Sequence, residues 1–519
     1  MTRPEELVRA VLGEFCRSDH EAALILGAAR ALGVDPLDYC MRRYGVEATQ
    51  VLERAAGWAD IAFSPVVPST DGSRVELRRI DGLAEARSIR ARLYDREVVY
   101  LAPRFEEFLG LRTYIAEHPQ VRRTTCIAPA SAIRSALTEM SAPQLLHEAR
   151  QRLARRWPFA SADLDLGRVA RWAFVGIGAA LTLLAMLAPL VLQTVLLPLI
   201  GLVLIAPALF RLGAVLASVD DRPPEPPPPL ADGNLPIYSV LIPLNDEAQM
   251  VPLLQRAMTA IEYPPEKLDI KFVVEKRSAD TVAAVKALLA DPRFELVTVP
   301  DAPPFTKPKA LDYALPLVRG AYVVVYDAED IPNPDQLRLA AAAFAADPGV
   351  DCLQAELLVD NARENALTGL FTGEYAGQFG IVLPALARWG MPMPLGGTSN
   401  HFRVAALREM GGWDAFNVTE DADLGVRLAR LRYRTGMLAS QTWEEAPVSL
   451  AVWMRQRTRW MKGWMRLCQR GPTSRFPSLS TNSRGASSAH RNSVATEFWT
   501  AALRARSSLD SRRGCWRAR

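Results

Sequence analysis

Residues 321–330, AYVVVYDAED, decide how the second half of this chain folds. Three valines flanked by tyrosines predict a short buried strand, and the acidic run Asp327-Ala328-Glu329-Asp330 ends it. Comparable strand-like runs precede it, with helical patterns between them: YSVLIPL (238–244), KFVVE (271–275) and ELVTVP (295–300). Alternating strands and helices predict an α/β domain over residues 235–465 with a mostly parallel sheet, whose ligands would lie at the carboxyl ends of the strands.

Two of these strands end in carboxylates. Glu275 closes one strand, and Asp327 and Glu329 follow another at i and i+2. Carboxylates in this arrangement can share Mg²⁺ or Mn²⁺ with the phosphates of a nucleotide. A D-x-E pair alone is a weak signal, because acids end strands in many proteins. In the segment FTKPKALDYAL, Lys307 and Lys309 are either phosphate ligands or part of an ordinary solvated helix start.

Two further motifs lie close together in the chain. Thr419-Glu420-Asp421 puts two carboxylates at a predicted helix start, and QRTRW (456–460) follows it. Gln456, Arg459 and Trp460 lie at i, i+3 and i+4, so one helical face presents all three. A carboxylate base, a guanidinium for a leaving diphosphate and an indole for a sugar ring are together suited to sugar transfer. For QRTRW taken alone, an ordinary interfacial helix is the simpler interpretation.

The stretch from Trp172 to Phe210 carries no charged residue over 39 positions. One membrane helix needs roughly 20 apolar residues, so the stretch is long enough for two. Arg168 and Arg171 before it, and Arg211 after it, place both ends in the cytoplasm by the positive-inside rule. We therefore expect a transmembrane helical hairpin over residues 169–212, with a buried soluble helix as the alternative.

The remaining segments predict no chemistry of their own. Residues 1–160 mix helical and strand-like patterns and predict a small α/β domain that regulates the protein or docks a partner. Residues 222–234 contain PPEPPPP, which predicts a stiff proline-rich linker. Residues 466–519 contain no apolar run, and their serines and arginines suggest a GC-rich gene read in the wrong frame. A disordered basic tail that touches anionic lipid is the alternative.

The net charge of +4 is unevenly distributed. Eleven arginines and two acids give residues 466–519 a charge of +9, which leaves −5 for residues 1–465. The excess of basic residues is thus confined to the tail, and the charge of the folded part does not predict nucleic-acid binding. The six cysteines are scattered without a CxxC pair, which fits a reducing compartment.

The order of these motifs resembles the inverting family-2 glycosyltransferases, specifically the processive membrane-bound branch that contains cellulose synthase and hyaluronan synthase. The resemblance covers residues 238–464 and implies a nucleotide-diphospho-sugar transferase fold of the GT-A type. It further implies a bacterial-type inner-membrane protein with several spans, whose N-terminal and catalytic domains are cytoplasmic. The donor would be a nucleotide sugar, UDP-linked in this branch, and the acceptor a growing polysaccharide.

At the donor side, the resemblance assigns roles to three residues. Glu275 matches the acid that contacts uridine, and Asp327 and Glu329 match the pair that binds the divalent metal and the diphosphate. Lys309 is expected near the diphosphate. Two departures stand out, since Lys276-Arg277 follow Glu275 where the family is more acidic, and Glu329 replaces the usual second aspartate.

At the acceptor side, Asp421 matches the catalytic base, and Glu420 is expected to contact the acceptor. Gln456 and Arg459 match the part of Q-x-x-R-W that holds the diphosphate, and Trp460 matches the residue at the acceptor end of the glycan.

Other interpretations remain open at this point. The chain could be a truncated or non-catalytic membrane adaptor with a degenerate transferase domain, or a non-processive transferase with a lipid-linked acceptor. Residues 1–160 weakly resemble the N-terminal module of type II secretion ATPases, through short helices followed by CIAPASAIRSAL. A regulatory partner at that domain is therefore expected.

Overall fold

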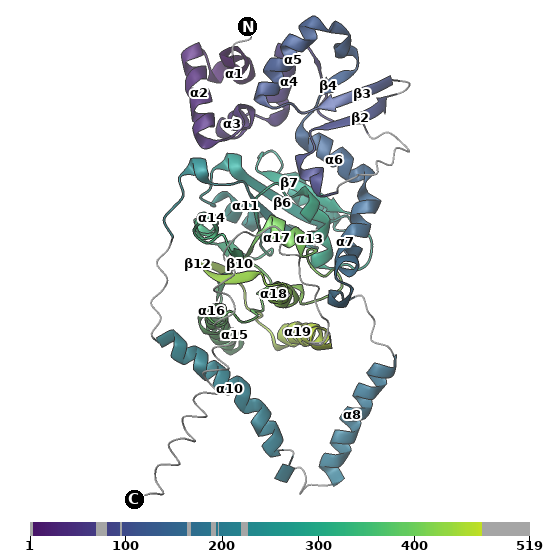
Figure 1. Ribbon diagram of the computed structural model, residues 1–519, viewed down its shortest axis with the longest axis vertical. Coiled ribbons are helices and arrows are strands. Elements are labelled where there is room, and N and C mark those ends of the chain that lie inside the picture. The colour runs from purple at the N-terminus through teal and green to yellow at the C-terminus, as the bar shows by residue number, and fades with distance from the viewer. Residues whose placement is uncertain are drawn as a thin grey trace, which may run out of the picture.

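The computed structural model describes residues 4–68, 80–93, 96–162, 168–187, 194–195, 197–219 and 227–469. Figure 1 shows a small N-terminal α/β domain, a larger α/β domain beside it, and two long helices that extend away from the larger domain. The predicted tail lies almost wholly outside the described residues, as does the first part of the proline-rich linker. The proposal of a frameshifted terminus therefore stays a prediction.

The N-terminal domain combines a helical bundle with a small sheet. Its four strands are β1 (Ala62–Phe63), β2 (Ser88–Leu93), β3 (Arg96–Leu101) and β4 (Thr125–Ile127), in the order β1-β4-β3-β2. Its helices are α1 (Pro4–Leu12), α2 (Asp19–Leu32), α3 (Pro36–Arg43), α4 (Ala48–Ala59), α5 (Phe105–Glu117), α6 (Ala130–Met140) and α7 (Ala142–Arg156). The first helices are amphipathic and bury one apolar stripe in a shared core, as the sequence pattern requires.

The larger domain is built on one eight-stranded sheet with the order β7-β6-β5-β8-β11-β10-β12-β9. The strands are β5 (Tyr238–Leu244), β6 (Leu268–Glu275), β7 (Phe294–Val299), β8 (Tyr322–Val325), β9 (Ile331–Pro332), β10 (Val350–Val359), β11 (Asn400–Arg403) and β12 (Arg434–Glu444). Only β9 and β11 run antiparallel to their neighbours. The prediction of a mostly parallel sheet is therefore confirmed, with two reversed strands that the sequence pattern did not indicate.

Helices surround this sheet. They are α11 (Val251–Thr259), α12 (Ala279–Lys286), α13 (Lys307–Ala314), α14 (Gln336–Ala346), α15 (Ala366–Gly377), α16 (Leu383–Arg388), α17 (Val404–Glu409), α18 (Glu420–Arg430) and α19 (Leu450–Gln469). Because helices cover both faces, the central strands β5 and β6 are almost entirely buried. This explains their nearly continuous apolar sequence.

The carboxyl ends of the six co-directional strands lie along one edge of the sheet. Glu275 ends β6, Asp327 follows β8 by two residues, and Glu444 ends β12. Parallel pairing fixes this arrangement, for example between Leu241 of β5 and Val325 of β8. Acidic side chains from distant parts of the chain are therefore gathered at one edge.

The N-terminal domain packs directly against the larger domain. Leu153 and Trp157 at the end of α7 belong to the same hydrophobic core as Leu311 of α13 and Trp413. Polar contacts reinforce the interface, since the Arg42 guanidinium donates hydrogen bonds to the carbonyls of Pro265 and Leu268 at 2.7 and 2.9 Å. Figure 1 shows α7 beside α13 of the larger domain.

The expected hairpin appears as two helices of unequal character, α8 (Arg168–Leu187) and α10 (Leu197–Val219). Among the described residues, one helix is long and apolar enough to cross a membrane: Leu197–Ser218, with a mean hydropathy of 2.3. The apolar part of α8, Val175–Leu184, is shorter than the roughly 20 residues that a span needs. The described residues thus contain one candidate span where two were predicted, so the hairpin is not confirmed. Residues 188–193 between the helices lie outside the described residues.

Helix α10 is joined to the larger domain at its carboxyl end. The Phe210 ring meets the Trp389 ring edge to face at 5.6 Å between centroids, and the Arg388 guanidinium donates a hydrogen bond to the Ala217 carbonyl at 2.7 Å. Most of its other apolar side chains are exposed. The contact holds the larger domain next to the candidate span.

Candidate active site

The centre of the candidate site is formed by the side chains of Asp327 and Asp421 and by the backbone at Gly397. Asp327 follows β8, and Asp421 lies in the first turn of α18. A methyl group built on Gly397 would lie 3.4 Å from Asp421 Oδ2 and 3.9 Å from Asp327 Oδ2. Both carboxylates therefore lie close to the space that a side chain at position 397 would enter, and the glycine leaves that space open.

Lys307 is the cation at this centre. Its ammonium, at the start of α13, forms an ion pair with Asp327 Oδ1 and donates a hydrogen bond to the Gly397 carbonyl at 2.6 Å. Burial alone would lower the pKa of Lys307, but the carboxylates of Asp327, Glu420 and Asp421 raise it. Lys307 therefore stays charged at any physiological pH and neutralises part of the acidic cluster.

Several carboxyl groups around this centre hold their protons more tightly than usual. Burial raises the pKa of Glu420 to about 7, with Asp421 adding to the shift, and burial likewise raises the pKa of Asp421. Burial and the neighbouring Asp327 raise the pKa of Glu329 to about 7. Burial raises the pKa of Glu444 to about 8, against the effect of a hydrogen bond from the Tyr375 hydroxyl. The excess of negative charge makes the cluster a suitable place for cationic ligands.

Glu275 and Lys309, both predicted at the donor side, form an ion pair with each other. The Lys309 ammonium lies 2.8 Å from Glu275 Oε1 and donates a hydrogen bond to the Ala302 carbonyl at 2.7 Å. Both side chains are almost completely buried. Above this pair, the Arg277 guanidinium lies 4.1 Å from the centroid of the Phe305 ring. Lys309 is thus committed to Glu275, and Lys307 is the lysine that reaches Asp327.

The predicted face of α19 is only partly as expected. Gln456 and Trp460 are half-buried and point toward the domain, whereas Arg459 is exposed. The Gln456 side-chain oxygen is buried, and it has no hydrogen-bond partner among the described residues. Trp460 packs near Phe371 of α15.

Arg457 is a residue of this face that sequence reasoning did not single out. Its guanidinium lies 4.6 Å from the Trp460 ring and 5.5 Å from the Phe371 ring, and it forms an ion pair with Glu374 of α15. Arg457 belongs to the QRTRW motif, but its inward direction depends on the position of α15. The motif therefore indicated Arg457, but the direction of the Arg457 side chain could not be predicted from the sequence.

Glu444 and Tyr375 were also missed. Glu444 ends β12 at the same edge as Asp327, and Tyr375 of α15 donates to it. The position of Glu444 at the end of a strand, shortly before QRTRW, could have indicated it as a site residue. The strand itself is only partly buried on its outer face, which makes its pattern hard to recognise.

Asp327 and Glu329 are the candidate metal ligands. No group of three or more His, Cys, Asp or Glu side chains in the described part of the chain could hold a metal ion by itself. Two hard carboxylate oxygens nevertheless fit a site in which the phosphates of a nucleotide supply further ligands. The residues present are therefore compatible with a divalent ion that binds together with a nucleotide.

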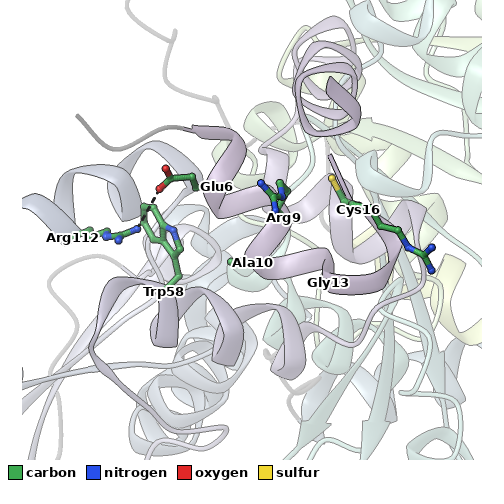
Figure 2. Close-up of a pocket in the computed structure, with 8 residues that line it drawn as sticks. Glu6, Arg9, Ala10, Gly13, Cys16, Trp58 and Arg112 are labelled. Atoms are coloured by element: carbon green, nitrogen blue, oxygen red, sulfur yellow. Dashed lines mark ion pairs between the residues drawn. The ribbon is translucent and has the colours of Figure 1, made fainter. Parts of the chain in front are cut away.

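A shallow hollow of about 580 Å³ lies in the N-terminal domain, away from the acidic cluster. Figure 2 shows Glu6 and Arg9 of α1 at this hollow, and the Arg112 guanidinium beside the Trp58 ring with an ion pair to Glu6. Arg112 approaches Glu6 Oε2 at 3.7 Å and the centroid of the Trp58 ring at 4.3 Å. The hollow contains none of the predicted site residues.

Comparison with known proteins identifies the larger domain. The family model described as "Glycosyl transferase family group 2" matches residues 322–506. The probable glycosyltransferase YdaM of Bacillus subtilis (strain 168) is 28% identical over 234 residues, which cover 44% of this chain and 56% of that protein. Residues 322–506 are therefore similar to a glycosyltransferase family 2 domain. The larger domain that contains most of them has the mostly parallel sheet expected from the sequence.

Other relatives differ in the acceptors that their names imply. The beta-monoglucosyldiacylglycerol synthase of Trichormus variabilis is 28% identical over 235 residues, covering 44% of this chain and 49% of that protein. The cellulose synthase catalytic subunit (UDP-forming) of Pseudomonas fluorescens is 28% identical over 239 residues, covering 44% and 31%. The matched part of this chain thus spans about half the length of YdaM and of the beta-monoglucosyldiacylglycerol synthase, and about a third of the cellulose synthase subunit.

Among solved structures, the mannosyltransferase PcManGT from Pyrobaculum calidifontis, in complex with GDP-Man and Mn²⁺, is 20% identical. The alignment covers 51% of this chain and 71% of that protein, with a TM-score of 0.41. These matches do not show the resemblance of residues 1–160 to secretion ATPases, which stays a prediction.

Proposed function

We propose that this protein is a membrane-bound inverting glycosyltransferase that uses a nucleotide-sugar donor. The observation that carries the proposal is that the Asp421 and Asp327 carboxylates meet in the space beside Gly397, with Lys307 bound to Asp327. One carboxylate is available as a base, and a cation stands where a leaving diphosphate would gain negative charge. Family 2 relatives support the reaction class.

Asp421 is the proposed base. An inverting transfer needs a carboxylate that takes the proton of the acceptor hydroxyl while the diphosphate leaves from the opposite face of the sugar. The Asp421 carboxyl is buried beside Glu420, and burial raises its pKa. A carboxyl group with a higher pKa is a stronger base once it is deprotonated. Glu420 would contact the acceptor from the same turn of α18.

Lys307, Gln456 and Arg459 would bind the donor diphosphate. Lys307 can exchange Asp327 for phosphate oxygens without leaving the site, because its ion pair is partly open to solvent. The side-chain N–H2 of the half-buried Gln456 would donate to a phosphate oxygen, and Arg459 is exposed on the same helix. Preorganised cations of this kind stabilise the charge that develops on the leaving group.

The nucleotide end of the donor would lie over the pair Glu275–Lys309. The Arg277 guanidinium on Phe305 provides a flat surface next to that pair. A divalent Mg²⁺ or Mn²⁺ would be held by Asp327 and Glu329, and its chemistry would be to offset phosphate charge. UDP is the proposed nucleotide, because the sequence resembles a branch of the family whose donors are UDP-linked sugars.

The acceptor is proposed to lie between α15 and α19, where Trp460 and the stacked rings of Phe371 and Tyr375 gather. A growing polysaccharide is the first candidate. A lipid-linked acceptor is the second, and it is favoured by the relatives named beta-monoglucosyldiacylglycerol synthase. Both acceptors would reach the site at the membrane, beside α10. The two α/β domains would lie on the cytoplasmic side of an inner membrane. The N-terminal domain would bind a regulatory partner.

Replacement of Asp421 by asparagine tests the proposal. Asparagine keeps the shape of the side chain but cannot take a proton, so transfer of labelled sugar by membranes should fall by roughly 10³-fold. Asp335→Asn is the matched control, since Asp335 is exposed at the start of α14. Equal activity of the Asp421→Asn variant and the unmodified protein would favour a non-catalytic adaptor instead. Separate assays with polysaccharide and diacylglycerol acceptors distinguish the two candidate acceptors.

A further inference from the structure

Helix α19 approaches the start of α18 more closely than a side chain would allow. A methyl group built on Gly463 would lie 2.1 Å from Thr419 Oγ1, 2.4 Å from Thr419 Cγ2 and 2.7 Å from Thr419 Cβ. All three distances are far shorter than van der Waals contact. Gly463 is the one residue of α19 that is buried, among those of its residues whose side chains the structure describes.

Thr419 has little freedom to move away. Its side chain is 5% exposed, and it directly precedes α18. Its backbone N–H donates a hydrogen bond to Asn417 Oδ1 at 3.3 Å, and its hydroxyl donates to the same oxygen at 3.4 Å. A larger residue at position 463 would therefore displace α19 rather than Thr419.

The position of this contact along α19 gives it consequences for the site. Gly463 follows Gln456 by seven residues and Trp460 by three, so the three lie on one helical face. Thr419 precedes Asp421 by two residues. The contact therefore joins the helix that carries the proposed diphosphate and acceptor groups to the turn that carries the proposed base.

We propose that Gly463 is a positioning residue, which sets the distance between the Gln456–Trp460 face of α19 and the Asp421 turn of α18. This inference rests on the proposed function and deepens it, because it assigns the alignment of two halves of the site to one glycine. It predicts a separation between binding of the nucleoside end of the donor, which we place over Glu275 and Lys309, and binding of its diphosphate end.

The test uses the full chain in detergent with Mg²⁺, and UDP and UMP as probes. Gly463→Ala should lower kcat/KM for the sugar donor by roughly 100-fold, since a displacement near 1 Å is enough for such a loss. The affinity for UDP should fall about tenfold through weakened contacts to the β-phosphate. The affinity for UMP should stay unchanged, which a merely structural defect would not achieve.

Two further variants make the result specific. Thr419→Gly removes the atoms that the new methyl group would meet, so Gly463→Ala combined with Thr419→Gly should recover most of the loss caused by Gly463→Ala. Gly373→Ala, in the neighbouring helix α15, is the matched control because a methyl group there would meet no atom within 4 Å. That control should keep the activity of the unmodified protein.

Wild-type kinetics for Gly463→Ala, or no recovery in the double variant, would overturn the positioning role. Equal losses of UMP and UDP affinity would do the same, because they indicate a general disruption of the fold. If the unmodified chain neither binds UDP nor transfers sugar, the proposed function fails first, and that outcome is recognised without any variant.

Discussion

Two lysine–carboxylate pairs lie near the start of α13, and they differ in exposure. In the pair Lys309–Glu275, the side chains are 0% and 6% exposed, whereas in the pair Lys307–Asp327 they are 24% and 39% exposed. A buried pair is costly to separate because each partner would be left as an uncompensated charge. A partly open pair can exchange its partner for a charged ligand. The comparison suggests that the first pair holds the donor site in shape, while the second takes part in the reaction.

The largest effect should come from breaking the buried pair on one side only. Lys309→Met leaves the Glu275 carboxylate buried without its cation, and we expect a loss of about 3–5 kcal/mol in the free energy of unfolding. Denaturant titration of the purified protein measures it. The double variant Glu275→Leu with Lys309→Met should regain most of that stability, because no charge remains buried. A single variant as stable as the wild type would show that the pair does not stabilise the fold.

The open pair should respond in rate rather than in stability. Lys307→Met removes the proposed diphosphate cation, so kcat should fall by roughly 10²–10³-fold. Its melting temperature should stay close to that of the wild type, because Asp327 can be solvated. Steady-state kinetics with thermal unfolding of the same preparation checks both. A large loss of stability with normal kcat would reverse the assignment of the two pairs.

The pH dependence should reflect the acids that face Lys307. Burial raises the pKa of Asp421, and the neighbouring Glu420 has a pKa of about 7. A base must be deprotonated, so a profile of kcat against pH should fall on the acidic side through the raised pKa of Asp421. Glu420→Gln removes a negative neighbour and should move this acidic limb to lower pH.

The same acids set the sign of the pH effect on stability. The folded-state pKa of Glu420 lies above its unfolded value, so its contribution to stability is present in acid and is lost as the pH rises through about 7. Glu420→Gln should therefore weaken the loss of stability between about pH 4.5 and 7. An unchanged slope in this window would contradict the assigned shift.

The smallest effect is expected at an ion pair that is more exposed than either of these. Arg434 and Asp347 lie 2.8 Å apart at the surface, with 53% and 45% of their side chains exposed. Asp347→Asn should change the free energy of unfolding by less than about 1 kcal/mol and leave kcat unaltered. Denaturant titration in low and high salt measures this, and a loss as large as that of Lys309→Met would show that exposure does not order the three pairs.

Much of the fold could be predicted because local patterns suffice for it. The run at Tyr238–Leu244 and the strand that ends at Glu275 are nearly continuous in apolar residues, which only strands buried on both faces require. The reversed strand β11 was not predicted, because its four residues have no distinctive alternation. The membrane hairpin is not confirmed, because Val175–Leu184, the apolar part of α8 among the described residues, is shorter than a span needs.

The chemical groups of the site were predicted better than their pairing. Asp327 and Asp421 could be named from the strand end and the helix start. The orientation of Arg457 toward Glu374, and of Arg459 toward solvent, depends on where α15 lies against α19. Neither orientation follows from spacing along one helix.

The sequence by itself determined which residues end the strands and begin the helices, and therefore that acids gather at one edge of a parallel sheet. It did so because burial and hydrogen bonding act on neighbouring residues in a regular pattern. Only the tertiary structure decided that Lys309 pairs with Glu275, that Lys307 pairs with Asp327, and that Gly463 meets Thr419. These contacts join residues far apart in the chain, and their distances depend on how whole helices pack.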